Sequence, residues 1–437
     1  MSIFGGKKYS LTSGVAFILT AVVAVAVGLC GGDSSARGYR IPKDAVQLNK
    51  VLTNEACAVD SLARMEREIR PFLQKWGIIG STLCVMRNDS LLYAHSFGEA
   101  DDGVPMEPGN IMRVASVSKL ITAAGVMLLQ DRGVLSLDDT VFGEGDLLEE
   151  FRDVIKDRRY YNITIRHLLM HSAGFVVRGA DPLFATREMM TRLGQESSPS
   201  SEELIRWQLR RPLQYAPGTS SKYSNIGFLI LTLLIERATA TEYEDWINDN
   251  VLRPAGCYDC HLARNFYDER YRGEVRYHAH AGETTVPCFD GRGEVERCYG
   301  ANDITALKGA GGWVMSVPEL MRFVASVDGR PEVKDILSAD AVAQMTAVTD
   351  SVTFGLGWND CSEDGVWTRT GTLSSTSALI KYFPDGECWI FVTNTGTYRG
   401  PHFTKYVSTL FRRLREKYSD RMPGRNLFEG VGDKQAQ

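Results

Sequence analysis

The chain has 437 residues, of which 44% are hydrophobic, 24% charged and 10% aromatic. This composition is typical of a folded globular protein and excludes a disordered, collagen-like or coiled-coil chain. The 49 Lys and Arg residues are outnumbered by 54 Asp and Glu residues, giving a formal net charge of -5. A concentrated basic face is not expected, so we predict no nucleic-acid partner.

An uncharged apolar stretch lies near the N-terminus. Two lysines precede the nineteen residues from Leu11 to Leu29, and a polar run follows directly. This length suffices to cross a bilayer and also fits a long signal-peptide core. Lipoprotein cleavage at Cys30 is disfavoured, because Leu29 stands where a small residue is needed. We expect residues 1–40 to be a signal peptide, or a membrane anchor if uncleaved, and the protein to be exported to a periplasmic or other extracytoplasmic space.

The segments after the leader predict one helix and one hairpin. Apolar residues at helical spacing from Asp60 to Trp76 indicate an amphipathic helix. Extended runs at residues 81–86 and 90–97 are separated by three polar residues, which predicts a hairpin.

The middle of the chain has helical patterns separated by Gly, Pro or Asn. These patterns cover residues 120–133, 165–174, 202–211, 226–240 and 243–253. Residues 265–301, rich in Gly, Arg, His and Tyr, are predicted to form an irregular loop.

Strands return near the C-terminus. Residues 377–383 and 387–394 flank a Pro-Asp-Gly turn, residues 403–418 predict a basic amphipathic helix, and the tail after Arg421 is expected to be frayed. Because strands gather at both ends of the chain, we predict an α+β fold, an α/β sandwich with an antiparallel sheet flanked by helices. The sheet would come from residues 60–115 and 310–418, with a mostly helical insertion at 125–305. The catalytic unit would span residues 41–420, and residues 421–437 would be the tail.

Eight of the nine cysteines lie after residue 40. Two near pairs, Cys257 with Cys260 and Cys288 with Cys298, would suit local disulfides in an oxidising compartment. Only one C-x-x-C occurs, so a zinc site with matched thiol pairs is not expected.

Three short motifs carry possible chemistry. Ser116 stands at the start of an apolar helix, and Lys119 shares its helical face. A lysine made neutral by burial could accept the serine proton. About a hundred residues later, Tyr223 and Asn225 precede another apolar helix; a tyrosine can relay a proton and an amide can both donate and accept.

The third motif is Arg369-Thr370-Gly371, which leads into a predicted strand. Glycine permits close backbone approach, and the N–H of Thr372 could form an oxyanion hole with that of Ser116.

Together these motifs resemble the serine β-lactamase and penicillin-binding-protein superfamily, in particular the class C β-lactamase-related branch with its D-alanyl-D-alanine carboxypeptidases and esterases. The resemblance runs from about Ile69 to Leu410. It includes ITIRHLLMHSAGF, PGTSSKYSN, GAGGWVMSVPELMRF and FGLGW, the last expected as the strand before the third motif.

The resemblance implies that Ser116 is the acylated nucleophile, Lys119 its activating partner, Tyr223 the general acid/base and Asn225 a substrate-orienting amide. Arg369 departs from the family pattern, which usually has lysine or histidine there. Because arginine stays charged and offers a planar fork, we predict that Arg369 binds a substrate carboxylate and helps to keep Lys119 neutral.

Rival sites are weaker. There is no G-x-S-x-G, so an α/β-hydrolase nucleophile elbow is not expected. His167 and His171 lie four residues apart, as zinc ligands can, but the glutamate of H-E-x-x-H is absent, so a metal site is not expected. Glu244 lies within a predicted helix and is interpreted as part of a solvated face.

We therefore expect an exported serine hydrolase that forms an acyl-enzyme with an ester, an amide or a peptidoglycan D-alanyl peptide, and that needs no metal or organic cofactor. Its partner would be a small-molecule or peptide substrate, and its oligomeric state stays open. The alternative is a weakly catalytic module that binds cell-wall peptide or a protein.

Overall fold

The computed structural model describes residues 41–176, 181–280, 282, 285–347 and 354–431. Residues 1–43 and 44–437 separate into two units, and the description below concerns the second. None of the described helices is long and apolar enough to span a membrane. The predicted leader segment, Leu11 to Leu29, lies outside the described residues.

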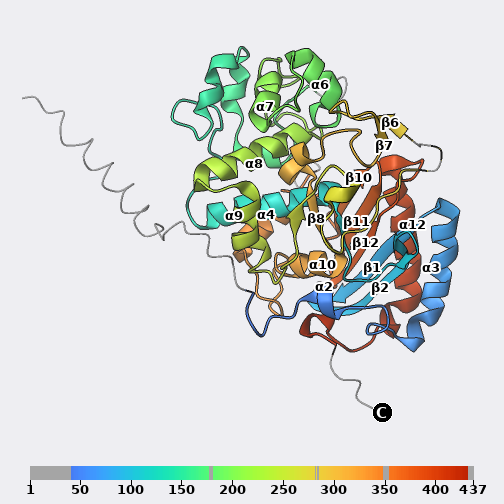
Figure 1. The fold of residues 1–437 in the computed structure, drawn as a ribbon. Coiled ribbons are helices and arrows are strands. Elements are labelled where there is room, and N and C mark those ends of the chain that lie inside the picture. Colours follow the sequence, from blue (N-terminus) through green and yellow to red (C-terminus); the bar gives the residue numbers. More distant parts are fainter. Residues whose placement is uncertain (1–40, 177–180, 281, 283–284, 348–353, 432–437) are drawn as a thin grey trace, which may run out of the picture. The chain divides into compact units, whose positions relative to one another are not determined.

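The second unit is built on a seven-stranded antiparallel sheet (Figure 1). In spatial order its strands are β3 (Val104–Pro105), β2 (Ser90–Asp101), β1 (Gly80–Arg87), β12 (Glu387–Thr393), β11 (Thr376–Tyr382), β10 (Trp367–Leu373) and β9 (Asp360–Cys361). The two ends of the chain meet where β1 pairs with β12, with Leu83 opposite Phe391. The expected antiparallel sheet built from both chain ends is confirmed.

The described residues form eleven named α-helices. They are α2 (Leu48–Val51), α3 (Ala63–Trp76), α4 (Ser118–Asp131), α5 (Ile165–Leu169), α6 (Thr186–Leu193), α7 (Ser201–Leu209), α8 (Asn225–Thr239), α9 (Tyr243–Ile247), α10 (Val317–Ala325), α11 (Ala339–Thr346) and α12 (Phe403–Tyr418). The terminal helices α3 and α12 cover one face of the sheet, and α10 packs on the other (Figure 1).

The two faces of the sheet have separate cores, because successive side chains of a strand point to opposite sides. Leu83 and Val85 of β1 join the cluster under α3 and α12, whereas Cys84 and Met86 join the larger cluster that contains α4 and α8. Helix α4 is buried along almost its whole length, so its N-terminus is held firmly in the interior.

A second, three-stranded sheet has the order β4 (Ile111–Arg113), β8 (Trp313–Ser316) and β5 (His261–Leu262). These strands stand outside the main sheet, although the sequence analysis assigned residues 111–113 and 313–316 to it. The helical segments between β4 and β8 include α5 to α9, in agreement with the mostly helical middle.

Three expectations about local structure were wrong. Residues 354–358 of FGLGW form no strand, because glycines there allow close packing: a Cβ on Gly357 would lie 2.6 Å from Ala123 Cβ. The tail is not frayed up to residue 430, since Leu427 and Phe428 are 2% and 6% exposed. The segment 265–301 contains a short hairpin of β6 (Thr285–Pro287) and β7 (Glu294–Glu296).

The two cysteine pairs that would suit local disulfides form none here, because all eight cysteines after residue 40 are free and buried. The Cys257 thiol instead lies 3.1 Å from the Glu319 carbonyl, and the Cys298 thiol lies 3.2 Å from the Tyr277 carbonyl.

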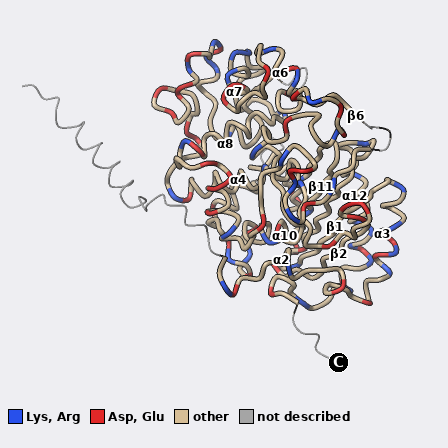
Figure 2. Tube along the Cα trace, in the orientation of Figure 1, with Lys and Arg blue, Asp and Glu red and all other residues tan. Residues whose placement is uncertain are grey.

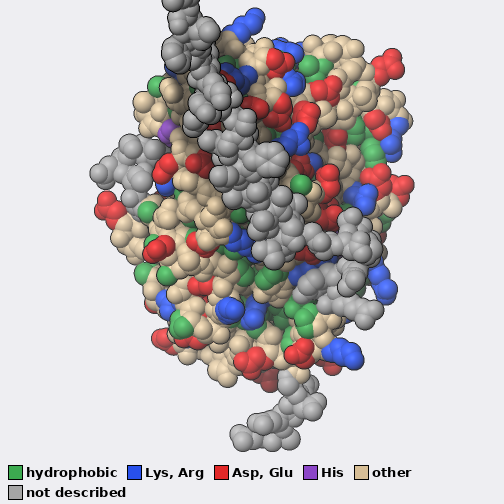
Figure 3. All heavy atoms as spheres, turned by 90° about the vertical axis from the view of Figure 1, so that its left-hand side faces the viewer, with side chains coloured by type: hydrophobic (Ala, Val, Ile, Leu, Met, Phe, Trp, Pro, Cys, Tyr) green, Lys and Arg blue, Asp and Glu red, His purple; other side chains and the backbone are tan. Residues whose placement is uncertain are grey.

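Charged residues of both signs are interspersed along the chain (Figure 2), and the face drawn in Figure 3 likewise mixes acidic, basic and apolar side chains. This distribution agrees with the near balance of charges in the sequence.

Candidate active site

Ser116 lies in a tight turn, η2 (Ala115–Val117), that runs directly into α4. The preceding residue, Ala115, has a φ of 51°, in the left-handed region that side chains disfavour. Ser118 braces this turn by donating a hydrogen bond to the Ala115 carbonyl at 2.6 Å, and Ser118 Oγ accepts one from the Trp313 N–H at 3.0 Å. The half-buried Ser116 is thus presented by a braced, strained backbone.

Lys119 is completely buried one turn into α4. Its Nζ lies 3.4 Å from Ser116 Oγ, donates to Asn225 Oδ1 at 2.6 Å and donates to the Ala310 carbonyl. Burial, with a smaller contribution from the Arg369 charge, lowers the pKa of Lys119 to about 8. A substantial neutral fraction near neutral pH makes Lys119 a candidate base for the serine hydroxyl.

Tyr223 precedes α8 and reaches the same oxygen. Its hydroxyl donates to Ser116 Oγ at 2.7 Å, and Lys119 Nζ lies 4.8 Å from the centre of its ring. Burial raises the pKa of Tyr223, but the Lys119 and Arg369 charges outweigh it and leave the pKa below its ordinary value. Ser116 therefore has two groups within reach whose pKa values both lie below their ordinary values, which favours proton exchange at one oxygen near neutral pH.

Arg369, in β10, is fully buried behind the serine. Its Nε donates to the Ser116 carbonyl at 2.8 Å, and a second guanidinium nitrogen donates to the same oxygen. The fork thus holds the backbone of Ser116, a role that the sequence did not predict, and the expected binding of a substrate carboxylate stays a prediction. Its effect on the pKa of Lys119 fits the other half of that expectation.

The other residues of this motif position β10 against the serine turn. A Cβ on Gly371 would lie 2.5 Å from the Val114 carbonyl and 3.0 Å from the Ser116 nitrogen, so only glycine allows this approach. Thr370 donates to Asn359 Oδ1 from its backbone N–H at 2.6 Å and from its hydroxyl at 3.1 Å. Thr372 follows on the same strand, opposite Ser377 of β11.

Asp181 belongs to the site although the sequence analysis did not select it. Its Oδ2 accepts a hydrogen bond from Asn225 Nδ2 at 2.8 Å, which directs the amide oxygen of Asn225 toward Lys119. No sequence pattern indicates this contact, because Asp181 and Asn225 are 44 residues apart. The Ala310 carbonyl was missed as well, although it lies within the glycine-rich stretch GAGGW.

His171 is buried against the ring of Tyr223, with ring centres 4.5 Å apart. Its Nδ1 accepts from the Ser224 N–H at 3.2 Å, and burial, assisted by Lys119 and Arg369, lowers its pKa well below the usual value. His171 therefore holds the Tyr223 segment as a neutral ring.

The remaining rival residues have structural contacts. His167 Nδ1 accepts from the Thr164 N–H at 3.1 Å at the start of α5. Glu244, interpreted above as part of a solvated face, accepts from the Leu262 N–H at 2.9 Å and so holds β5. In the described part of the chain, no three His, Cys, Asp or Glu side chains are grouped so that they could hold a metal ion.

The geometry thus joins a serine hydroxyl and a buried amine on one segment to a phenol that lies 107 residues further along the chain. The family model described as Beta-lactamase matches residues 65–406. The chain belongs to the β-lactamase family. It is a serine hydrolase, in agreement with the resemblance of its motifs.

Similar proteins include several kinds of hydrolase. The chain is 28% identical over 316 residues to "Esterase EstB" of Burkholderia gladioli, covering 69% of this chain and 79% of the esterase. It is 24% identical over 398 residues to a "Putative D-alanyl-D-alanine carboxypeptidase" of Escherichia coli O157:H7, covering 85% and 86%.

Its fold is similar to that of a D-amino acid amidase from Ochrobactrum anthropi SV3, with a TM-score of 0.63 at 19% identity. The match covers 84% of this chain and all of the amidase (100%). This likeness supports the fold alone.

Proposed function

We propose that this serine hydrolase forms an acyl-enzyme on Ser116 and acts on esters or amides whose reacting end is uncharged. Lys119 takes the serine proton, Ser116 Oγ attacks the substrate carbonyl, and Tyr223 passes a proton to the leaving oxygen or nitrogen. The backbone N–H groups of Ser116 and Thr372 stabilise the oxyanion. Water then releases the acyl group by the reverse sequence of proton transfers.

One observation carries this proposal: Ser116 Oγ accepts from Tyr223 at 2.7 Å and lies 3.4 Å from the buried Lys119 Nζ. A serine that only capped a helix would not need a fully buried amine beside it, because burying a charge is costly. The relatives include an esterase and a putative carboxypeptidase, and this range fits the same acyl chemistry with different leaving groups.

The preference for uncharged substrates follows from Arg369. Two of its guanidinium nitrogens donate to the Ser116 carbonyl, the third, Nη1, is buried without a hydrogen-bond partner among the described residues, and the side chain is fully buried. A D-alanyl peptide carries a carboxylate next to the reacting bond and would need a cation facing the cleft. We therefore place neutral esters and amides before D-alanyl peptides and β-lactams as substrates.

The test is covalent capture combined with turnover. The full chain is incubated with a fluorescent fluorophosphonate or a fluorescent penicillin, and the adduct is located by peptide mass. In the wild type we expect a fluorophosphonate adduct on Ser116 and hydrolysis of p-nitrophenyl butyrate. Both should be lost in Ser116→Ala. Both should be kept in Ser220→Ala, which changes an exposed serine.

Absence of any adduct on Ser116 with both reagents would contradict the proposal and favour the alternative of a weakly catalytic binding module. A neutral ester and its carboxylate-bearing analogue are compared in parallel. A higher kcat/KM for the charged analogue would contradict the proposed substrate preference without affecting the acyl-enzyme.

We also propose that the enzyme is exported through its N-terminal segment. Support comes from the nineteen uncharged residues from Leu11 to Leu29 and the two lysines before them. Alkaline phosphatase fused after residue 40 is active only if it crosses the membrane, so we expect the fusion to show phosphatase activity. An inactive fusion that stays in the cytosol would contradict export.

A further inference from the structure

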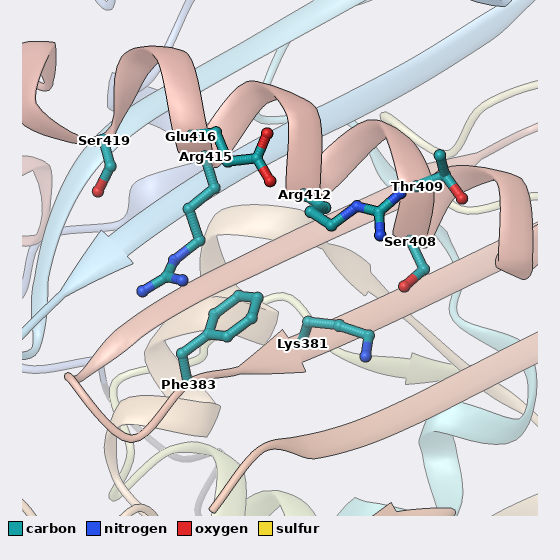
Figure 4. A pocket seen from close by; sticks show the side chains of 8 residues that line it. All are labelled: Lys381, Phe383, Ser408, Thr409, Arg412, Arg415, Glu416 and Ser419. Atoms are coloured by element: carbon teal, nitrogen blue, oxygen red, sulfur yellow. The ribbon is translucent and has the colours of Figure 1, made fainter. Parts of the chain in front are cut away.

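A pocket of ≈ 470 Å³ lies between β11, including its end, and α12, on the face of the main sheet that α12 covers (Figure 4). Its walls are Lys381 and Phe383 from the β11 side and Ser408, Thr409, Arg412, Arg415, Glu416 and Ser419 from α12 and its end. None of these residues takes part in the active site described above.

Some of the hydrogen-bond donors in the pocket wall already bind acceptors of the protein. Arg415 donates to the buried carboxylate of Glu387 at 2.5 Å and pairs with Asp385, and its guanidinium lies 4.1 Å from the centre of the Phe383 ring. Thr409 donates to the Lys405 carbonyl at 3.1 Å. These contacts hold the wall of the pocket in place.

Other donors in the pocket wall have no such partners. Within the described residues, the side chains of Lys381, Arg412 and Ser408 form no hydrogen bond or ion pair with a protein group, so their donors can bind a ligand. Figure 4 shows the polar ends of these three side chains in one half of the pocket, with Phe383 and Arg415 in the other. Two cations thus share one half of the pocket, whose wall also contains one carboxylate, that of Glu416.

We propose that this pocket binds an organic phosphate. The phosphate oxygens would accept from Arg412, Lys381 and the Ser408 hydroxyl, since a guanidinium fork and an ammonium group both suit a dianion. The remainder of the ligand would lie over the Phe383 ring, which Arg415 keeps in place. Glu416, also in the wall, opposes the anion and so limits its affinity.

The test measures binding of phenyl phosphate to the full chain by titration calorimetry at low and high salt. We expect binding that weakens with salt, falls at least tenfold in Lys381→Ala/Arg412→Ala, and becomes tighter in Glu416→Gln. Arg413→Ala, an exposed neighbour on α12 outside the pocket, is the matched control and is expected to bind normally. Far-UV circular dichroism and melting check that each variant is folded.

Two further arms separate the sources of the phosphate. Inorganic phosphate alone would bind more weakly than phenyl phosphate if the Phe383 wall contributes. The wild type and the double variant are also mixed with phosphatidylglycerol or phosphatidylcholine vesicles. If only the wild type binds, and it prefers phosphatidylglycerol, the phosphate belongs to a lipid headgroup. Binding of phenyl phosphate without vesicle binding would assign it to a soluble ligand. No binding to any probe, or equal loss in Arg413→Ala, would overturn the proposal.

Discussion

The ammonium group of Lys119 is surrounded by Asn225 Oδ1, the Ala310 carbonyl and Ser116 Oγ. These acceptors favour the charged amine, whereas complete burial and the Arg369 guanidinium favour the neutral one. The balance lowers the pKa of Lys119 to about 8, close to the pH at which a base is most useful.

The pH profile should follow from this balance. Because the neutral amine is the base, kcat/KM for a neutral ester should rise with pH and level off above about pH 8, the pKa of Lys119. Arg369→Met removes a charge that lowers this pKa, so the rising limb should move to higher pH, whereas Arg369→Lys should retain most of the original profile. A midpoint that stays unchanged in Arg369→Met would show that the arginine does not act on Lys119.

Asp181 should act as a positioning residue through Asn225. Asp181→Ala removes the acceptor of Asn225 Nδ2, so the amide can rotate away from Lys119, and we expect a 10- to 100-fold loss of kcat/KM, about 1.4–2.7 kcal/mol. Asp181→Asn keeps an acceptor oxygen and should lose less.

Both Asp181 variants remove a negative charge that raises the pKa of Lys119, so their pH profiles should move to lower pH. A purely structural role would lower activity without this movement. The combined measurement of kcat/KM and its pH midpoint therefore distinguishes the two roles.

Among the elements, the contact between β10 and the η2 turn is decisive for the site. Gly371 makes this contact possible, and the Arg369 fork fastens the strand to the Ser116 carbonyl. Arg369 and Ser116 are 253 residues apart in the sequence. The proposed nucleophile and oxyanion donors are therefore positioned by packing between elements.

Gly371→Ala should separate these elements. The added Cβ would meet the Val114 carbonyl at 2.5 Å, and backbone on both sides must shift. A displacement of about 1 Å at a reacting group can cost about 100-fold in rate, so we expect at least that loss in kcat/KM, measured with p-nitrophenyl butyrate. Gly424→Ala, at a glycine with open space around it, is the control and should keep wild-type activity. Retention of activity in Gly371→Ala would show that the turn tolerates a wider spacing.

At the level of the whole molecule, the C-terminal tail closes the core beside β2. Asn426 Oδ1 accepts from the Leu91 N–H at 3.2 Å, and Arg425 donates to the Leu92 carbonyl at 3.0 Å. Leu427 and Phe428 are buried in the same core cluster as β1 and α4 residues. The tail thus contributes to stability although it is distant in sequence from the elements that it contacts.

Leu427→Ala/Phe428→Ala should destabilise the protein by several kcal/mol, because each truncation of a buried side chain of this kind costs about 2–5 kcal/mol. Urea unfolding of this variant should show a lower midpoint than that of Val431→Ala, which changes an exposed residue. Equal midpoints would mean that the tail is not packed in solution.

The buried thiols give a second prediction for the folded protein. Burial raises the pKa of the Cys84 and Cys388 thiols well above the usual value, which suppresses their reactive thiolate form. Under native conditions the eight cysteines after residue 40 should therefore react slowly with a thiol reagent, and all eight should react after denaturation without a reductant. Fewer than eight reactive thiols in the denatured protein would reveal a disulfide.

Local pattern predicted the helices and hairpins well. The helix beginning near Asp60, the hairpin of β1 and β2 and the terminal helix α12 follow from periodicity and turn residues, which act over a few neighbouring positions. The strand expected at FGLGW was wrong, because Gly357 there allows close packing against α4. A short sequence pattern does not contain this contact with a distant segment.

Ser116, Lys119, Tyr223 and Arg369 could be selected from the amino-acid sequence, since each stands in a short motif beside a recognisable helix or strand. Tertiary structure alone brought Asp181 and the Ala310 carbonyl to them and turned Arg369 toward the Ser116 backbone. The reason is physical: motif chemistry depends on side-chain type, whereas hydrogen-bond partners, burial and pKa depend on which distant segments the sheet and α8 place together.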